Sequence, residues 1–165
     1  MKAETGFEAI DPLQLDRQVC FALAVANRAV LAVYRPLLEP MGLTHPQYLV
    51  MLALWGEAPM SVKDIGEAIQ LDSPTLSPLL KRLEAAGLIT RRRDAHNERS
   101  LVVDLTDAGR ELRREAEKIP PAVVARLGVS LADLEELREV LGRVNAAARQ
   151  SVLADPEQSM KGNRK

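Results

Sequence analysis

The sequence predicts a mainly α-helical fold with one small β-hairpin, arranged as a winged helix-turn-helix. Apolar residues recur three and four positions apart over most of the chain, which is typical of helices that bury one face. Aromatic residues are only 3 % of the sequence, which favours aliphatic helix packing over a large β-sandwich. Two short segments that favour strands, Leu88–Arg93 and Leu101–Leu105, flank a polar stretch and predict the hairpin. With 165 residues, 47 % of them hydrophobic, we expect one domain that folds without disulfides.

The first half of the chain predicts two helices. Apolar positions extend the first helical pattern over residues 13–41, and Pro36 within it predicts a kink or an end one turn early. Thr44 is then expected to cap a helix over Pro46–Gly56, with Gln47 completing a capping box.

The middle of the chain predicts the helix-turn-helix itself. Ser61 is expected to cap a short helix, Val62–Gln70. After a turn, Ser73 is expected to cap a second helix that opens with Pro74 and ends at Gly87. The hairpin follows directly, and this order of elements is that of a winged helix-turn-helix.

The C-terminal part predicts two further helices and a helical dimer. Thr106 is expected to cap Asp107–Lys118, which ends at Pro120-Pro121, and Ser130 is expected to start a helix to about Leu153. The outer helices carry apolar stripes that so small a core cannot cover, which predicts an intertwined two-fold dimer. We therefore expect a polar segment over 1–12, a dimerisation helix over 13–42, a DNA-binding domain over 43–119, C-terminal dimerisation helices over 120–153 and a polar tail over 154–165.

Composition excludes several classes of protein and site. Lys and Arg total 22 against 23 Asp and Glu, so the net charge of −1 gives no global attraction to nucleic acid or membrane. The single cysteine, Cys20, excludes an intrachain disulfide and a cysteine-based zinc site, and two histidines do not favour a metal centre or any other cofactor. The longest apolar runs are too short to span a bilayer, and no signal peptide precedes them. The expected compartment is the cytoplasm.

A local basic surface points to double-stranded DNA as a partner. The helix that follows Asp72 begins with small hydroxyl side chains, which approach base edges and phosphates closely. Between positions 81 and 93 lie five basic residues and one acid, a local charge of +4, and one more arginine lies across the hairpin. The alternative is an ordinary solvated charged face. The candidate DNA-binding residues are Ser73, Thr75, Ser77, Lys81, Arg82, Arg91, Arg93 and Arg99.

Cys20 supports two interpretations. A cysteine in an apolar helix is most often a small hydrophobic residue of the core. A sensor thiol instead needs a lowered pKa and access to oxidant. Tyr34 lies 14 residues along the same helix, about 21 Å away, so it can reach Cys20 only from a second copy in an antiparallel dimer. A thiol site here would therefore lie between subunits.

Several motifs resemble the MarR family of regulators, and within it the organic hydroperoxide resistance branch. The similar segments are Leu15–Leu23, Tyr34–Leu38, Leu43–Leu49, Leu71–Glu84 and Glu98–Thr106. The resemblance implies a homodimeric winged-helix repressor whose Cys20 is oxidised by organic hydroperoxide to a sulfenic acid, after which DNA is released. It also implies that the partner's Tyr34 contacts the thiol. Because no second cysteine is present, a small-molecule thiol or over-oxidation would complete the reaction.

The sequence departs from the branch at three positions. Ala24 and His45 stand where tyrosines are usual, and Asn97 stands where the wing usually has an acid. His45 is a candidate redox residue, since an imidazolium near sulfur lowers a thiol pKa. Ala24 would enlarge the site for a bulkier oxidant. The alternative is that His45 only begins the second helix and the thiol chemistry has been lost.

Three other functions remain as alternatives. The first is a repressor that is switched by a small aromatic acid, with Cys20 inert. The second is a thiol peroxidase, but the chain lacks the second cysteine that would complete its reaction, so we do not expect an enzyme. The third is a helical dimerisation module, which leaves the Ser73–Arg99 block unexplained.

Overall fold

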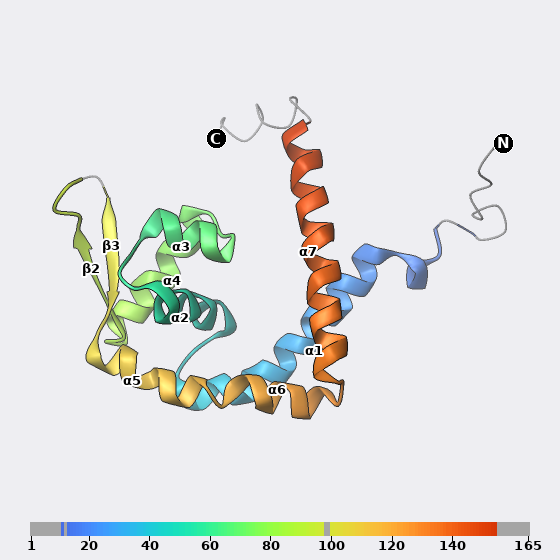
Figure 1. Ribbon diagram of the computed structural model, residues 1–165, viewed down its shortest axis with the longest axis horizontal. Coiled ribbons are helices and arrows are strands. Elements are labelled where there is room, and N and C mark those ends of the chain that lie inside the picture. Colours follow the sequence, from blue (N-terminus) through green and yellow to red (C-terminus); the bar gives the residue numbers. More distant parts are fainter. Residues whose placement is uncertain (1–10, 12, 98–99, 155–165) are drawn as a thin grey trace. The chain divides into compact units, whose positions relative to one another are not determined.

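The computed structural model of the chain describes residues 11, 13–97 and 100–154 (Figure 1). It is helical apart from one small antiparallel sheet. The chain divides into two compact units, Met1–Val123 and Val124–Lys165. The first unit holds the winged helix-turn-helix, which confirms the predicted fold class.

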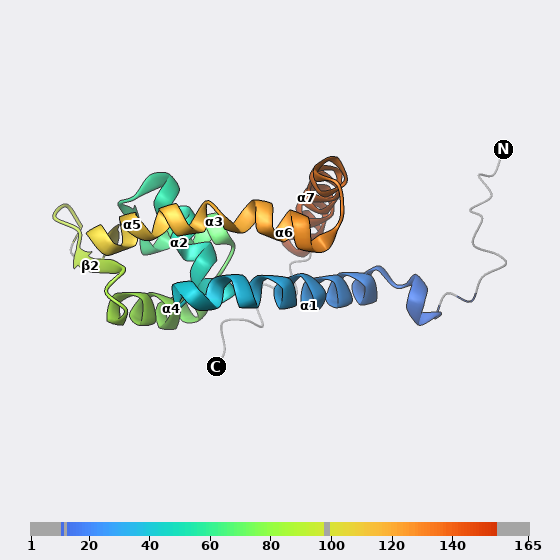
Figure 2. The same cartoon turned by 90° about the horizontal axis from the view of Figure 1, so that it is seen from below.

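The N-terminal helix is long, and its buried residue, Leu38, lies at its C-terminal end. A turn of 3-10 helix, η1 (Leu15–Arg17), precedes α1 (Val19–Leu38), and a second one, η2 (Glu39–Met41), follows it. The α-helix continues through Pro36 and gives way to 3-10 helix after Leu38. Leu38 is 1 % exposed, whereas Val19 is 66 % exposed. Figure 2 shows the N-terminal part of α1 extending beyond α2 and α4.

The exposed helix also has the length and composition of a membrane-crossing segment. The stretch Val19–Met41 has a mean hydropathy of 1.3 and lies near the N-terminus. Arg28, however, lies in the middle of α1 and is exposed. A cation at the centre of a bilayer costs about 2.5–3.5 kcal/mol on insertion scales. The helix is therefore better suited to cover by another protein surface.

Helix α2 (His45–Glu57) begins at the predicted capping box. Gln47 Oε1 accepts a hydrogen bond from the Thr44 backbone N–H at 2.8 Å, which satisfies a donor that helix geometry leaves unpaired. The helix carries much of the core, because Val50, Met51 and Leu54 are fully buried.

The helix-turn-helix follows the predicted order with one difference at its second cap. Helix α3 (Val62–Ile69) is capped by Ser61, whose hydroxyl accepts from Asp64 N–H at 3.0 Å. Helix α4 (Ser73–Ala85) is capped by Asp72, whose carboxylate accepts from Thr75 N–H at 3.1 Å. Ser73 is thus the first helical residue and the expectation that it caps was wrong. A carboxylate one residue earlier caps equally well and also carries charge.

The wing is a hairpin within a three-stranded sheet. Strands β2 (Ile89–Arg93) and β3 (Leu101–Leu105) pair antiparallel, with Arg91 opposite Val103. A two-residue strand, β1 (Met60–Ser61), pairs with the other edge of β3, giving the order β1-β3-β2. The sequence did not predict β1, since two residues carry no periodicity.

The core of this unit is aliphatic. Its fully buried large side chains come from α1, α2, α3, α4 and the sheet: Leu38, Val50, Met51, Leu54, Ile65, Leu76, Leu80, Leu83, Ile89 and Val103. Burial of this kind stabilises a fold by about 25 cal/mol for each Å² of apolar surface removed from water. The core holds α4 and the wing on one scaffold.

Three helices complete the chain. Helix α5 (Asp107–Ala116) is capped by Thr106 as predicted, with 3.0 Å from Gly109 N–H to the Thr106 hydroxyl. Helix α6 (Ile119–Leu127) was not predicted. Its two prolines occupy the first turn, where the missing N–H groups cost nothing, so they begin a helix as well as ending one. Helix α7 (Leu131–Ala154) follows the Ser130 cap and exposes apolar residues such as Leu137 and Val144.

Gly109 fixes how closely α5 approaches the wing. A Cβ at this position would lie 2.1 Å from the carbonyl oxygen of Leu88, so α5 and the start of β2 touch through backbone atoms. Only glycine permits this approach.

We expect Gly109→Ala to lower the free energy of unfolding by about 1–3 kcal/mol or more, because backbone rather than a flexible side chain must move. Urea unfolding followed by circular dichroism measures the loss. The matched control is Gly56→Ala near the end of α2, where the added Cβ meets nothing within 4 Å. That variant should be neutral or more stable by up to about 1 kcal/mol. Equal stability of the two variants would contradict the close contact.

Candidate nucleic-acid interface and thiol site

Helix α4 separates an aliphatic buried face from a polar exposed face. Its leucines point into the core, whereas Ser73, Thr75, Lys81 and Arg82 are exposed and Ser77 is half-buried. Hydrogen bonds from Thr75 lower the pKa of the capping carboxylate of Asp72, so this cap stays ionised at neutral pH. The exposed face therefore presents hydroxyls at the start of the helix and cations one to two turns later.

Arg91 ties the wing to α4. Its Nε donates to Glu84 Oε2 at 2.9 Å, and its backbone N–H donates to Glu84 Oε1 at 3.2 Å. The hydrogen bonds from Arg91 lower the pKa of Glu84. Sequence analysis named Arg91 as a DNA contact, but in the structure its half-buried guanidinium already pairs with Glu84, a residue that the sequence did not single out. Because partner and cation lie seven positions apart in different elements, only the fold reveals the pair.

The structure describes some of the remaining wing residues and not others. Arg92 and Arg93 are exposed on β2. The turn beyond them is shaped by Asp94, whose carboxylate accepts from His96 N–H at 2.8 Å and whose own N–H donates to the Ser100 carbonyl at 2.9 Å. Arg99 lies outside the described residues.

The predicted thiol residues fall in two places. Cys20 is exposed in the first turn of α1. Tyr34 and His45 lie together where α1 meets α2, with ring centroids 5.0 Å apart in a T-shaped contact. Within one chain Cys20 is thus apart from the other two, as its 14-residue separation from Tyr34 along the helix requires.

Burial changes the chemistry expected of His45. The surrounding protein, which includes Tyr34 and Tyr48, desolvates the imidazole and lowers its pKa. The neutral ring is therefore the favoured form at neutral pH, and the imidazolium that the sequence suggested is disfavoured. A neutral imidazole retains one lone pair, which accepts a proton or a hydrogen bond. At neutral pH the ring therefore offers a hydrogen-bond acceptor and carries no positive charge.

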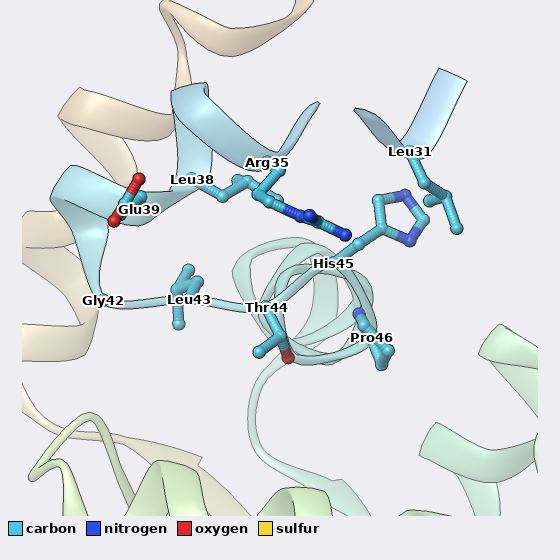
Figure 3. Close-up of a pocket in the computed structure, with 9 residues that line it drawn as sticks. All are labelled: Leu31, Arg35, Leu38, Glu39, Gly42, Leu43, Thr44, His45 and Pro46. Atoms are coloured by element: carbon cyan, nitrogen blue, oxygen red, sulfur yellow. The ribbon is translucent and has the colours of Figure 1, made fainter. Parts of the chain in front are cut away.

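A pocket of about 560 Å³ opens beside His45 (Figure 3). It is lined by Leu31, Arg35, Leu38, Glu39, Gly42, Leu43, Thr44, His45 and Pro46. The side chain of Arg35 reaches into it from α1, while His45 enters from α2 (Figure 3). Sequence analysis missed Arg35, because its position in a helix does not indicate that the segment between α1 and α2 folds back beside it. Among the described residues no cluster of three or more His, Cys, Asp or Glu side chains is arranged to hold a metal.

We expect the stability of the protein to decrease as pH falls because of His45. The folded state holds the pKa of His45 below its ordinary value, so the unfolded chain binds this proton more readily and acid favours unfolding. At fixed protein concentration, the free energy of unfolding should decrease less for His45→Gln than for the wild type between about pH 7.5 and about pH 5.5. Urea titrations across this range measure it. His96→Gln, which removes the exposed wing histidine, is the control and should follow the wild type. Parallel curves for wild type and His45→Gln would show that burial does not perturb His45.

Comparison with known proteins agrees with the fold and the motifs. The MarR family model matches residues 43–101. The organic hydroperoxide resistance transcriptional regulator of Bacillus subtilis is 41 % identical over 131 residues, which cover 79 % of this chain and 89 % of that protein. The transcriptional regulator TtmR of Methylorubrum extorquens is 47 % identical over 139 residues, which cover 84 % and 70 % respectively. These relatives are named as regulators and not as enzymes.

A solved structure extends the similarity to the whole fold. Reduced AbfR of Staphylococcus epidermidis bound to DNA superposes with a TM-score of 0.73 at 32 % identity, covering 84 % of this chain and 94 % of AbfR. The identity to relatives matched over most of their length, together with the winged helix-turn-helix, confirms the resemblance seen in the motifs. The chain belongs to the MarR family.

Proposed function

We propose that this chain is a homodimeric DNA-binding transcriptional regulator that organic hydroperoxides switch off by oxidising Cys20. The observation that carries the proposal is the exposed thiol on an apolar helix face that the chain itself does not cover. The similarity to an organic hydroperoxide resistance regulator supports it. The cytoplasm is the compartment that suits a regulator of DNA.

The DNA contact would be made by α4 and the wing. The exposed hydroxyls at the start of α4 suit a major groove, and Lys81 and Arg82 suit the phosphates beside it. Arg93 and Arg99 would add cations from the wing, whereas Arg91 would brace the wing against α4 and reach phosphate less freely. The similarity to AbfR, whose reduced form was solved bound to DNA, supports DNA as the partner.

A second copy would cover the exposed apolar residues. In α1 these include Val19, Phe21, Leu23 and Val25, and α7 has a similar exposed set. The proposed dimerisation segments are 13–42 and 120–153, which flank the DNA-binding domain over 43–119. An antiparallel crossing of two α1 helices would place Cys20 near Tyr34 and His45 of the partner subunit.

The proposed chemistry needs one thiolate and one hydroperoxide. His45 of the partner subunit would accept the thiol proton, because its neutral form has a free lone pair. The Cys20 thiolate then attacks the terminal peroxide oxygen, the O–O bond breaks, and sulfenic acid and an alcohol result once the proton returns to the leaving oxygen. A small-molecule thiol can next displace water from the sulfenic acid and leave a mixed disulfide. Either product enlarges the group at the seam between subunits and would change the spacing of the two α4 helices.

A second candidate function rests on the pocket beside His45. It has room for a small aromatic acid, and Arg35 offers a cation for the carboxylate. In that case the ligand would switch the regulator and Cys20 would be inert.

We expect one equivalent of cumene hydroperoxide to add a single oxygen atom to Cys20 and to release DNA from the same sample. The probe is a duplex selected from random sequences with the reduced protein. Intact-protein mass spectrometry measures the oxygen addition, and a gel shift measures the release of DNA. Cys20→Ser should gain no oxygen and keep its DNA. If this variant still releases DNA with peroxide, Cys20 is not the switch; release by salicylate in its place would support the ligand-switched alternative.

We expect Lys81→Ala and Arg93→Ala to weaken binding to every duplex tested. Each lost phosphate contact should reduce the slope of log affinity against log salt by about 0.9. Fluorescence anisotropy over a salt series measures both quantities. Lys118→Ala removes the same charge from beyond the end of α5, where Lys118 pairs with Glu115 at 2.8 Å, and it should leave the slope unchanged. An unchanged slope in the first two variants would remove them from the DNA interface.

A further inference from the structure

Three of the five aromatic residues in this chain join with His45 in a continuous series of ring contacts. Tyr34 on α1 contacts His45 and Tyr48 on α2, with centroid distances of 5.0 and 6.1 Å. Tyr48 contacts Trp55 one and a half to two turns further along α2, at 6.4 Å. Rings are stiff and interiors are closely packed, so a shift of one ring moves the next. The series runs from the proposed thiol site along α2.

The series ends at the backbone of α5. The indole N–H of Trp55 donates to the Gly109 carbonyl at 2.8 Å, across 54 positions of sequence. A carbonyl in the first turn of a helix ordinarily accepts a hydrogen bond from a backbone N–H one turn later in the same helix. The Gly109 carbonyl therefore has the Trp55 indole as a second donor, from outside α5. Trp55 is thus the point where the aromatic residues are joined to the segment that follows the wing.

Gly109 is itself locked to the start of the wing. Its position against the Leu88 carbonyl leaves no room for a side chain. Next to it, Thr106 donates from its backbone N–H to Leu88 at 3.1 Å and from its hydroxyl to Gly87 at 2.6 Å. Any displacement of Gly109 is therefore passed to the residues that enter β2.

The wing in turn is fastened to α4. The hydrogen bonds from Arg91 to Glu84 join β2 to the last turns of that helix. A pocket of about 280 Å³ between α2 and α5 is lined by Trp55, Leu52 and Arg113 among others, so on that side the indole is held by its hydrogen bond to Gly109 and not by packing. A shift of the Tyr34 ring can thus be passed through these contacts to α4 and the wing, which move together.

We infer that Trp55 is a positioning residue that couples the Tyr34–His45 site to the wing through its hydrogen bond to Gly109. The inference rests on the proposed function, because it assigns how oxidation of Cys20 at that site changes DNA affinity. Trp55 lies on α2, apart from Cys20 on α1, and is not among the residues proposed to contact DNA. Its removal should affect the coupling and leave the oxidation itself unchanged.

The experiment compares wild type with Trp55→Phe, which keeps a ring in α2 and loses the N–H donor. The measured quantity is the ratio of the DNA dissociation constants of the oxidised and reduced proteins, on a duplex selected with reduced wild type. We expect the rate of oxygen addition to Cys20, followed by mass spectrometry, to be unchanged. The ratio should fall about three- to tenfold, which is the size of one net hydrogen bond.

Two further proteins separate the hydrogen bond from packing. Because Trp55 is the only tryptophan in the chain, benzothienylalanine can replace it selectively in a tryptophan auxotroph, which keeps the shape of the indole without its donor. This protein should show the same fall in the ratio. Glu57→Gln, an exposed change at the end of α2, should keep the wild-type ratio.

The outcomes are distinct. A wild-type ratio in both donor-free proteins overturns the inference and leaves the proposed function intact. If DNA binding is weakened equally in the reduced and oxidised forms of these proteins, the ratio is unchanged, and this result also overturns the inference. Wild-type protein that keeps its DNA after oxidation contradicts the proposed function and the inference together. Trp55 fluorescence gives a reading without DNA: the emission should shift with peroxide in the wild type and stay constant in Cys20→Ser.

Discussion

The apolar surface on α1 that the chain cannot cover by itself is the constraint on which the rest depends. The core of the winged unit is filled by side chains from α2, α3, α4 and the sheet, and from α1 it takes the C-terminal end with Leu38. The N-terminal half is left outside with large aliphatic side chains in water, and Arg28 makes a bilayer a poor cover. A protein partner removes this cost, and a second copy supplies a matching surface. Cys20 lies on this same half of the helix, so in the proposed dimer a change at its sulfur would act on the seam.

Local signals predicted most of the fold, because caps and turns are decided by a few neighbouring residues. Thr44 with Gln47, Ser61, Thr106 and the hairpin are all as expected. The errors arise where a second residue that can cap a helix lies one position away, or where the effect of a proline depends on its position within a helix. Asp72 takes the cap from Ser73, and Pro120 and Pro121, which were expected only to end a helix, lie in the first turn of α6. Strand β1 exists only because β3 lies beside it, which no local pattern records.

The candidate site was less predictable than the fold, because its interactions join distant positions. The Arg91–Glu84 pair and the Trp55–Gly109 hydrogen bond depend on packing between elements. The case of His45 is different. Its place near Tyr34 is compatible with a redox role, yet burial favours the neutral ring and so replaces the suggested cation with a base. Residue type and spacing locate such a group, whereas its protonation is set by surroundings that appear only after folding.

The way in which α4 and the wing are joined limits how a switch at the seam can act. Because Arg91 binds Glu84 and Thr106 binds Gly87, the base of the wing is tied to α4 and to the segment between α4 and β2. Oxidation need not unfold these elements. With a net charge of −1, the chain adds no overall electrostatic attraction to DNA beyond that of its local basic surface. Two linked units bind far more tightly than either alone only while both reach their half-sites. Under the proposed function, a modest change in their spacing at the seam would release the protein, and one oxygen atom added to the sulfur of Cys20 would be a sufficient trigger.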